Sequence, residues 1–248
     1  MDYAIKNKVI LVTGAASGIG RETALLLAAE GAHIAACDLS EGGASETVKQ
    51  IETAGGKAKA WALDVTDFQA CADTVEAIAN EMGPLYGLCN VAGVLSDTPF
   101  GESTPEDWQM ELNVCLLGTM NMCRAAMNEL AKTEYSKIVN IASDAGRIGE
   151  KTMVAYSAAK GGVIAFTKSM AKLLGKSRVN VNVICPGTTR TPMTEFVTDE
   201  MEAKWARLYP LRRLGQPRDV AAAVAFFCSQ NSNWITGQAL PVNGGFSM

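Results

Sequence analysis

Tyr156 and Lys160 are the residues whose types and spacing first indicate chemistry in this chain. Four positions apart on a helix, they share one face, where an ammonium can stabilise a phenolate and turn the phenol into a base. The same spacing also fits an ordinary amphipathic pair, and the pattern arises by chance in about one sequence of this composition in four. The remaining motifs must decide between these two interpretations.

A glycine-rich segment, TGAASGIG at residues 13–20, joins an apolar run to a helical pattern. Gly14, Gly18 and Gly20 allow a tight turn in which backbone amides and a helix N-terminus meet a pyrophosphate. Asp38 ends the next apolar run, where a carboxylate can accept hydrogen bonds from the ribose hydroxyls of an adenosine. Glycines that serve only the turn and a solvated Asp38 are the alternative, but together the two features favour a dinucleotide site.

Apolar runs alternate with helical patterns along the whole chain, and residues 188–216 are predicted to be irregular. We expect strands over 8–14, 33–38, 58–65, 86–93, 137–143, 179–187 and 238–245, and helices over 18–31, 43–54, 67–82, 104–132, 153–174 and 217–229. This alternation predicts an α/β fold with a parallel sheet covered on both faces, in which ligands bind at the carboxyl ends of the strands. The residues at those ends are Gly14, Asp38, Asp64, Asn90, Ser143 and Pro186.

Composition and charge exclude several classes of function. The 248 residues are 48% hydrophobic, which suits one domain over residues 1–248 with a large core. A net charge of −4 without basic runs argues against a nucleic-acid partner, and no apolar run reaches the roughly 18 residues that span a membrane. No signal-peptide pattern is visible, and the seven cysteines lack metal-ligand spacing, so we expect a cytoplasmic protein without a metal site. The single histidine, His33, lies in an expected strand, which disfavours a Ser-His-Asp hydrolase.

Taken in order, the motifs resemble the short-chain dehydrogenase/reductase family over the whole chain. The matching residues are Thr13-Gly-x-x-x-Gly-x-Gly20, Asp64-Val65, Asn90-x-Ala92-Gly93, Asn113, Ser143, Tyr156-x-x-x-Lys160 and Pro186-Gly187-x-x-x-Thr191. The resemblance implies a single doubly wound, Rossmann-type domain. Its seven-stranded parallel sheet would have the strand order 3-2-1-4-5-6-7, with an irregular substrate lid near 188–216. It also implies hydride transfer with a nicotinamide cofactor.

The resemblance assigns roles to individual residues. Tyr156 is implied to be the general acid/base, Ser143 to bind the substrate oxygen, and Lys160 to bind the nicotinamide ribose and lower the pKa of Tyr156. Asn113 is implied to hold a water that links Lys160 to solvent. The implied cofactor-binding residues are Gly14, Ser17, Gly18, Ile19, Gly20, Asp38, Asp64, Val65, Asn90, Ala92, Gly93, Tyr156, Lys160, Pro186, Gly187, Thr188 and Thr191. Val91 replaces the family's usual asparagine, which predicts a local adjustment at the sheet centre.

The cofactor and the substrate pocket can also be predicted. Asp38 would repel the 2′-phosphate of NADP, and Arg21 on the first helical turn can face away from the ribose, so we expect NAD. Residues 94–100, 144–150 and 192–213 should wall the substrate pocket. Its apolar lining would come from Leu95, Phe100, Met153, Met193, Phe196 and Tyr209, whereas Asp144, Arg147, Glu150 and Arg190 are expected to be solvated loop charges.

We therefore predict NAD-dependent oxidation of a secondary alcohol to a ketone, with alicyclic alcohols and hydroxyacyl thioesters among the candidate substrates. Segment 143–149 also resembles dehydrogenases of alicyclic hydroxyacyl-CoA thioesters. The alternatives are a 3-oxoacyl-thioester reductase, acting on acyl carrier protein or CoA and usually favouring NADPH, and an NAD-binding regulator without turnover. Residues 105–132 and 153–174 are apolar on most sides, which predicts contact with other subunits, and the resemblance implies a homotetramer.

Overall fold

A parallel sheet forms the centre of the protein, which is described here by a computed structural model over residues 2–96 and 98–248. Within these ranges the strand order is β3-β2-β1-β4-β5-β6-β7, as predicted. Asp97, in the segment expected to wall the substrate pocket, lies outside the described residues. The strands are β1 (Val9–Thr13), β2 (His33–Asp38), β3 (Lys57–Ala62), β4 (Leu85–Asn90), β5 (Lys137–Ile141), β6 (Asn180–Pro186) and β7 (Ala239–Val242).

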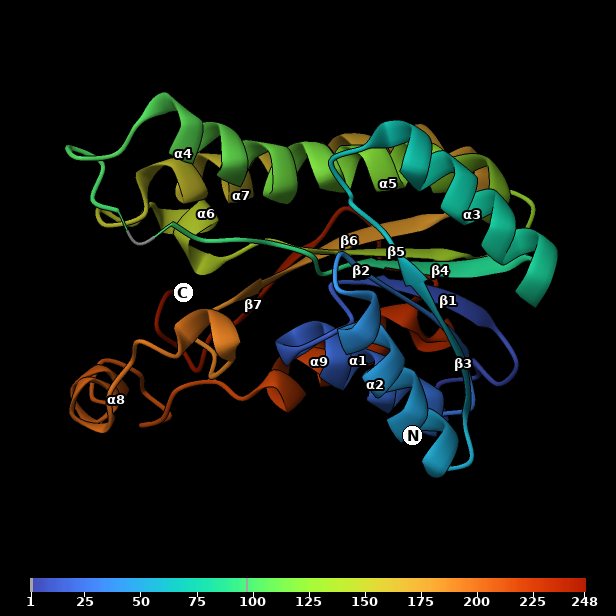
Figure 1. The fold of residues 1–248 in the computed structure, drawn as a ribbon, viewed down its shortest axis with the longest axis horizontal. Coiled ribbons are helices and arrows are strands. Elements are labelled where there is room, and N and C mark those ends of the chain that lie inside the picture. The colour runs from blue at the N-terminus through green and yellow to red at the C-terminus, as the bar shows by residue number, and fades with distance from the viewer. Residues whose placement is uncertain (1, 97) are drawn as a thin grey trace.

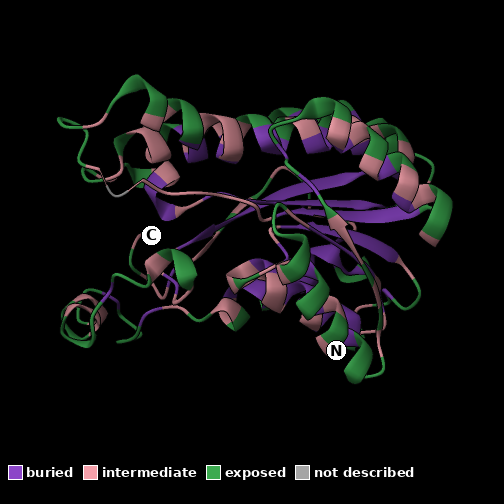
Figure 2. Ribbon diagram, in the orientation of Figure 1, coloured by how far each residue is buried: buried purple, intermediate pink, exposed green. Residues whose placement is uncertain are grey.

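Helices cover both faces of this sheet (Figure 1). One face carries α1 (Gly18–Ala29), α2 (Glu41–Thr53) and α9 (Pro217–Cys228), and the other carries α3 (Phe68–Met82), α5 (Gly118–Leu130) and α7 (Val154–Leu174). Because both faces are covered, the central strands are buried at every position, as in the runs VILVT of β1 and NVNVICP of β6 (Figure 2). The edge strand β3 alternates between exposed and half-buried residues instead.

Local signals explain where several helices begin. The Ser40 hydroxyl accepts a hydrogen bond from the Gly43 amide at the start of α2, and the Asp67 carboxylate accepts one from the Ala70 amide at the start of α3. Both helices begin within two residues of the predicted position.

Several elements differ from the prediction. The helix expected over 104–132 is divided into α4 (Pro105–Glu111), a π-helical segment (Leu112–Leu117) and α5. The segment expected to be irregular contains α8 (Asp199–Ala206), and a short helix, α6 (Asp144–Ile148), follows β5. The strand β4 ends at Asn90, so Val91, Ala92 and Gly93 belong to the loop that follows.

The strand order reverses between β1 and β4. Hydrogen bonds join the end of β1 to the loop that follows β4. The Thr13 hydroxyl accepts hydrogen bonds from the amides of Val91 (3.1 Å) and Ala92 (3.2 Å). A Cβ added to Gly14 would lie 2.9 Å from the Ala92 Cα, so only glycine allows this approach. In doubly wound sheets ligands bind beside such a reversal. None of the helices in the described part of the chain has the length and hydropathy needed to cross a membrane.

Candidate active site

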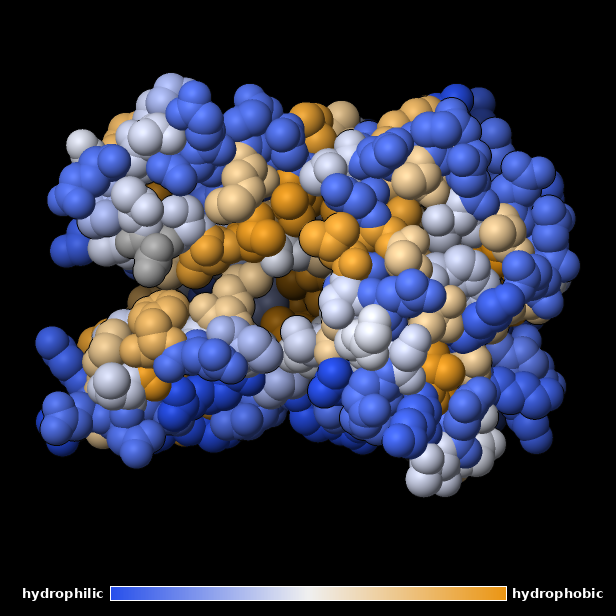
Figure 3. Space-filling view, in the orientation of Figure 1, coloured by the Kyte–Doolittle hydropathy of each residue, from blue (hydrophilic) through white to orange (hydrophobic). Residues whose placement is uncertain are grey.

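A cleft of about 880 Å³ opens at the carboxyl ends of the strands. Figure 3 shows it as a hollow between the lobe that contains α4, α6 and α7 and the lobe that contains α8, with apolar side chains along its walls. Its lining comes from the loops after β1, β2, β3, β4, β5 and β6 and from the segment around α8. The cleft therefore brings together most of the residues that the sequence singled out.

The glycine-rich loop forms one end of this cleft. Gly14 and Gly18 have positive φ angles of 67° and 51°, and a Cβ added to Gly20 would lie 1.9 Å from the Gly14 carbonyl oxygen. Ser17 precedes α1 without accepting a capping hydrogen bond, and the first turn of α1 has no acidic residue. The helix therefore presents backbone amides with no side-chain acceptor toward the cleft, which is the donor set that a pyrophosphate requires.

Asp38 lies beside this loop and also lines the cleft. Its carboxylate oxygens accept hydrogen bonds from the amides of Ala16 and Ser40, each at 2.9 Å, which fixes its orientation. Arg21 is directed away from the cleft, because its guanidinium donates to the Ala16 carbonyl and to the Thr47 hydroxyl. Asp38 is thus available to ribose hydroxyls, and Arg21 is engaged elsewhere as the sequence suggested.

Most of the other predicted cofactor residues line the cleft, but Asn90 does not. The amide nitrogen of Asn90 donates to the Asn140 side-chain oxygen (2.8 Å) in the core. Its own side-chain oxygen is buried without a hydrogen-bond partner among the described residues, next to the Val91 substitution. The residues that line the cleft are Ser17, Ile19, Asp64, Val65, Ala92, Gly93, Pro186, Gly187, Thr188 and Thr191.

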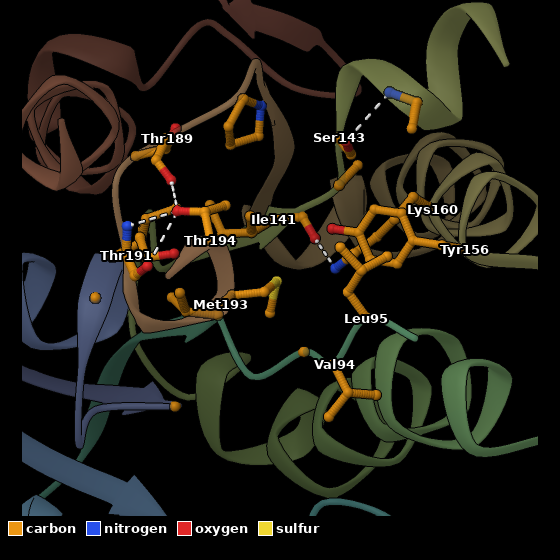
Figure 4. Close-up of a pocket in the computed structure, with 18 of the residues that line it drawn as sticks. Val94, Leu95, Ile141, Ser143, Tyr156, Lys160, Thr189, Thr191, Met193 and Thr194 are labelled. Atoms are coloured by element: carbon orange, nitrogen blue, oxygen red, sulfur yellow. Dashed lines mark hydrogen bonds between the residues drawn. The ribbon is translucent and has the colours of Figure 1, made fainter. Parts of the chain in front are cut away.

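Ser143, Tyr156 and Lys160 come together on one side of the cleft, opposite Thr191 and Met193 (Figure 4). Lys160 is buried, and its Nζ donates to the Ile141 carbonyl oxygen at 2.8 Å and lies 5.6 Å from the centre of the Tyr156 ring. An exposed amphipathic pair would leave its ammonium in water. The burial of Lys160 beside Tyr156 therefore favours the chemical interpretation of the pair.

The pKa of Tyr156 differs from the sequence-based expectation. Burial of the phenol by the cleft walls raises its pKa above the ordinary value, and the nearby Cys115 and Glu111 act in the same direction. The Lys160 ammonium lowers the pKa of Tyr156, as expected, and a hydrogen bond with Ser143 also lowers it, but together they do not outweigh burial. Tyr156 is therefore a protonated acid at neutral pH.

Lys160 remains charged in this environment. Burial lowers the pKa of Lys160, but the nearby Cys115, Tyr156 and Cys185 raise it by more than burial lowers it. The pKa of Lys160 therefore lies above its ordinary value. Asn113 belongs to the π-helical segment and does not line the cleft. Its side-chain oxygen accepts a hydrogen bond from Gln109 at 2.7 Å. A water held by Asn113 stays a prediction.

The substrate end of the cleft is apolar. Five of the six residues expected there line it, namely Leu95, Met153, Met193, Phe196 and Tyr209. Phe100 does not, because it stacks on Trp108 with ring centres 5.1 Å apart. Sequence reasoning missed Trp205, Leu208 and Phe246. The spacing of Met201, Trp205 and Leu208 is helical and was the available signal for the first two.

The charged residues near this end also depart from expectation. Glu150 lines the cleft, whereas Arg190 pairs with Glu202 on α8 and donates to the Val197 carbonyl. Asp144 is buried rather than solvated, and it is held by Arg147 and Asn243. Within residues 2–96 and 98–248, no group of His, Cys, Asp and Glu side chains is arranged to hold a metal ion.

Comparison with known proteins gives consistent results. The family model described as Enoyl-(Acyl carrier protein) reductase matches residues 14–247. The chain is 36% identical to the 3-oxoacyl-(acyl-carrier-protein) reductase FabG of Thermotoga maritima over 97% of this chain and 98% of that protein. It is 35% identical to the (3R)-3-hydroxyacyl-CoA dehydrogenase of Rattus norvegicus over 98% of both.

A solved structure extends this similarity to the fold. The short-chain dehydrogenase/reductase described as a glucose/ribitol dehydrogenase from Brucella melitensis superposes with a TM-score of 0.94 at 30% identity, covering 100% of both chains. Relatives with acyl-thioester names favour the alternative prediction, a 3-oxoacyl-thioester reductase, over the broader secondary-alcohol dehydrogenase.

Proposed function

The chain belongs to the short-chain dehydrogenase/reductase family of oxidoreductases, and we propose that it interconverts a 3-oxoacyl thioester and a 3-hydroxyacyl thioester using NAD. The observation that carries the proposal is the assembly of Ser143, Tyr156 and Lys160 at the apolar end of the cleft. The names of the relatives support the thioester, and the retention of all three residues disfavours a regulator without turnover.

The three side chains divide the chemistry between them. The Ser143 hydroxyl hydrogen-bonds the substrate oxygen, and Tyr156 gives a proton to this oxygen in reduction or takes it in oxidation. Because its pKa is raised, Tyr156 is protonated at neutral pH, which suits the acid required for reduction. The Lys160 ammonium stabilises the phenolate that reduction leaves behind. When bound, the nicotinamide supplies or accepts the hydride.

The cofactor assignment rests on the fit of the residues present. The uncapped α1 terminus and the glycine loop suit the pyrophosphate, while Asp38 suits the two ribose hydroxyls. The nicotinamide end would meet Thr188, Thr191 and Lys160. Asp38 disfavours a 2′-phosphate, and Arg21 is already bonded to Ala16, so we assign NAD rather than NADP.

The apolar lining near Tyr156 is consistent with an acyl chain. Met153, Met193 and Phe196 offer contacts to methylene groups and few hydrogen bonds, which disfavours a sugar or another polyol. A simple secondary alcohol also fits this lining and is the second candidate. The carrier of the acyl group, CoA or acyl carrier protein, is a further variable for the experiment.

We also propose that the chain acts as one domain over residues 1–248 and assembles into a homotetramer. Large apolar side chains remain exposed on α4, the π-helical segment, α5 and α7, among them Met110, Leu117, Met120 and Val154. A helix face of this kind is normally covered by another subunit. Seven free thiols among the described cysteines suit a reducing compartment, and we propose the cytoplasm.

Steady-state assays test this function. Purified protein is given acetoacetyl-CoA, a 3-oxoacyl-acyl carrier protein, crotonyl-CoA or cyclohexanone, each with NADH and with NADPH. We expect the highest kcat/KM with a 3-oxoacyl thioester and NADH. Better turnover of cyclohexanone supports the secondary-alcohol candidate, and turnover of crotonyl-CoA alone supports an enoyl reductase. Cofactor binding without turnover of any substrate would refute an enzyme.

A further inference from the structure

A buried polar cluster lies directly behind Ser143. Asp144 follows Ser143 in the chain and begins α6, and its side chain is only 6% exposed. One carboxylate oxygen accepts a hydrogen bond from Arg147 Nη1 at 2.9 Å, and the other accepts one from Asn243 Nδ2 at 2.6 Å. None of these side chains is explained by the reaction itself.

Segment 243–247, which follows β7, completes this cluster. Arg147 Nη1 donates to the Ser247 hydroxyl at 2.8 Å, and Asn243 Nδ2 donates to the Ser247 carbonyl oxygen at 2.8 Å. The Asn243 side-chain oxygen accepts from the Gly245 amide at 3.0 Å. We refer to Asp144, Arg147, Asn243 and Ser247 as the Asp144 cluster. It joins α6 to a segment about 100 positions away in the sequence.

The same segment also contacts the opposite side of the cleft. The Phe246 ring stacks on Tyr209 with centres 5.1 Å apart, and the Tyr209 hydroxyl accepts a hydrogen bond from the Thr188 amide at 3.0 Å. The Leu211 amide donates to the Gly244 carbonyl oxygen at 3.2 Å. Segment 243–247 therefore connects the Ser143 loop with the lid and with the loop after β6.

The other side of α6 packs against α7, the helix that carries Tyr156 and Lys160. A Cβ added to Gly146 would lie 2.5 Å from the Lys160 carbonyl carbon, so the backbones of α6 and α7 touch at this point. The helix is thus held between Lys160 on one side and the Asp144 cluster on the other. Because α6 is only five residues long, Arg147 lies about one turn from Ser143, which caps the start of the helix.

We propose that the Asp144 cluster positions the Ser143 hydroxyl against Tyr156 and couples it to the lid, so that Arg147 is a positioning residue. This inference rests on the proposed function, since it concerns how Ser143 meets a substrate oxygen. A buried ion pair adds little net stability once its desolvation is counted, which fits a role in orientation better than one in stability.

The position of Ser143 has a measurable consequence. Its hydrogen bond lowers the pKa of Tyr156, while Cys115 and Glu111 raise that pKa and Lys160 lowers it. In the oxidation direction the rate rises with pH as Tyr156 loses its proton. If Ser143 moves away, this rise shifts to higher pH, whereas a loss of stability alone leaves it in place.

The experiment compares the variants Arg147→Met, Arg147→Lys and Ser247→Ala with a control, Arg218→Met. The control also removes an arginine–carboxylate contact, the one between Arg218 on α9 and Glu22 on α1. For Arg147→Met we expect kcat with acetoacetyl-CoA and NADH to fall about tenfold, with little change in the KM for NADH. We expect the pH profile for 3-hydroxybutyryl-CoA oxidation to shift upward by about half a unit. Arg147→Lys should restore most of the activity, and Arg218→Met should behave as wild type.

Ser247→Ala removes one acceptor of Arg147 and should cause a smaller change in the same direction, about threefold in kcat. It keeps the test decisive if Arg147→Met does not fold. An unchanged kcat and pH profile in both variants would overturn the proposal, and so would failure of Arg147→Lys to restore activity.

Hydrogen exchange separates this inference from the proposed function. The Ala145 amide donates to the Ser143 hydroxyl, and we expect its peptide, residues 143–149, to exchange faster in Arg147→Met than in Arg218→Met. This readout needs no substrate. Absence of turnover in the wild type would reject the proposed function, whereas equal exchange in the two variants would reject the coupling.

Discussion

We expect the free energy of unfolding to fall steeply above about pH 9, because the fold buries ionisable thiols. Burial raises the pKa of Cys71 to about 11 and the pKa values of Cys123 and Cys185 to about 12. Burial also raises the pKa of Cys37, and the Cys228 thiol together with burial raises the pKa of Cys89 well above its ordinary value. In the unfolded chain these thiols ionise near pH 8.5. At a pH between the pKa of a thiol in the unfolded chain and its raised pKa in the folded protein, the unfolded state releases a proton that the folded state retains.

The size of the effect follows from these values. Each such thiol destabilises the fold by about 1.2 kcal/mol between about pH 9 and pH 10, so five amount to about 6 kcal/mol. Lys137 acts in the opposite sense, because its ammonium is buried against Asn180 (2.8 Å) and Asn233 (2.6 Å) and burial lowers its pKa to about 8. Because Lys137 is largely neutral in the folded state and still protonated in the unfolded state, it raises the free energy of unfolding by about 1 kcal/mol between about pH 9 and pH 10. The effect of the thiols is larger than that of Lys137. The net decrease in the free energy of unfolding, about 5 kcal/mol, is comparable to the stability of a typical domain.

Urea unfolding followed by circular dichroism under reducing conditions measures this loss. The unfolding free energy should fall between about pH 9 and pH 10, and Cys123→Ala should reduce the slope by about 1 kcal/mol per pH unit. Lys137→Met should make the slope steeper, since the opposing group is gone. A free energy that stays constant or rises over this range would refute the reasoning, because it would mean that the thiols are not protected in the folded state.

Three further outcomes are expected. Tyr156→Phe should lower kcat on the order of a thousandfold and leave NADH affinity, measured by fluorescence titration, unchanged; more than about a tenth of wild-type turnover contradicts the assignment. Asp38→Ala should narrow the ratio of kcat/KM for NADH over NADPH by about tenfold or more, and an unmoved ratio means that Asp38 does not contact the ribose. Gly146→Ala should destabilise the protein by about 1–3 kcal/mol in thermal unfolding, because the new Cβ meets Lys160, while Gly42→Ala, with open space around it, should not.

The sheet was predictable because its central strands are buried on both faces and are therefore rich in apolar residues, and because Gly31, Gly55 and Gly83 mark helix ends. The strand order came from the family resemblance rather than from periodicity. α8 was missed although Met201, Trp205 and Leu208 have helical spacing, because only Met201 and Trp205 of its eight residues are large and apolar and the pattern is therefore short. α6 is shorter than two turns and carries no helical pattern at all.

The composition of the active site was predicted better than its electrostatics. Ser143, Tyr156 and Lys160 were found by spacing and resemblance, but the raised pKa of Tyr156 depends on how the cleft walls desolvate it. Asp144 was expected in solvent because its partners, Asn243 and Ser247, lie far away in the sequence. Burial of a charge by distant residues leaves no local pattern from which it could be inferred.

The π-helical segment Leu112–Leu117 affects the chain as a one-residue insertion would. The side chains that follow it are rotated by about 100° relative to a continuous α-helix. Before it, Glu111 accepts a hydrogen bond from the Ser96 amide at 2.8 Å beside the cleft; after it, Gly118 lies so close to Val65 that an added Cβ would be 2.6 Å from the Val65 Cγ2. The two halves of this helix therefore differ in rotation about its axis: the first is fixed by the Ser96 loop and the second by the loop after β3. A relative that had lost a single residue here could retain every apolar side chain and still be unable to satisfy both halves at once.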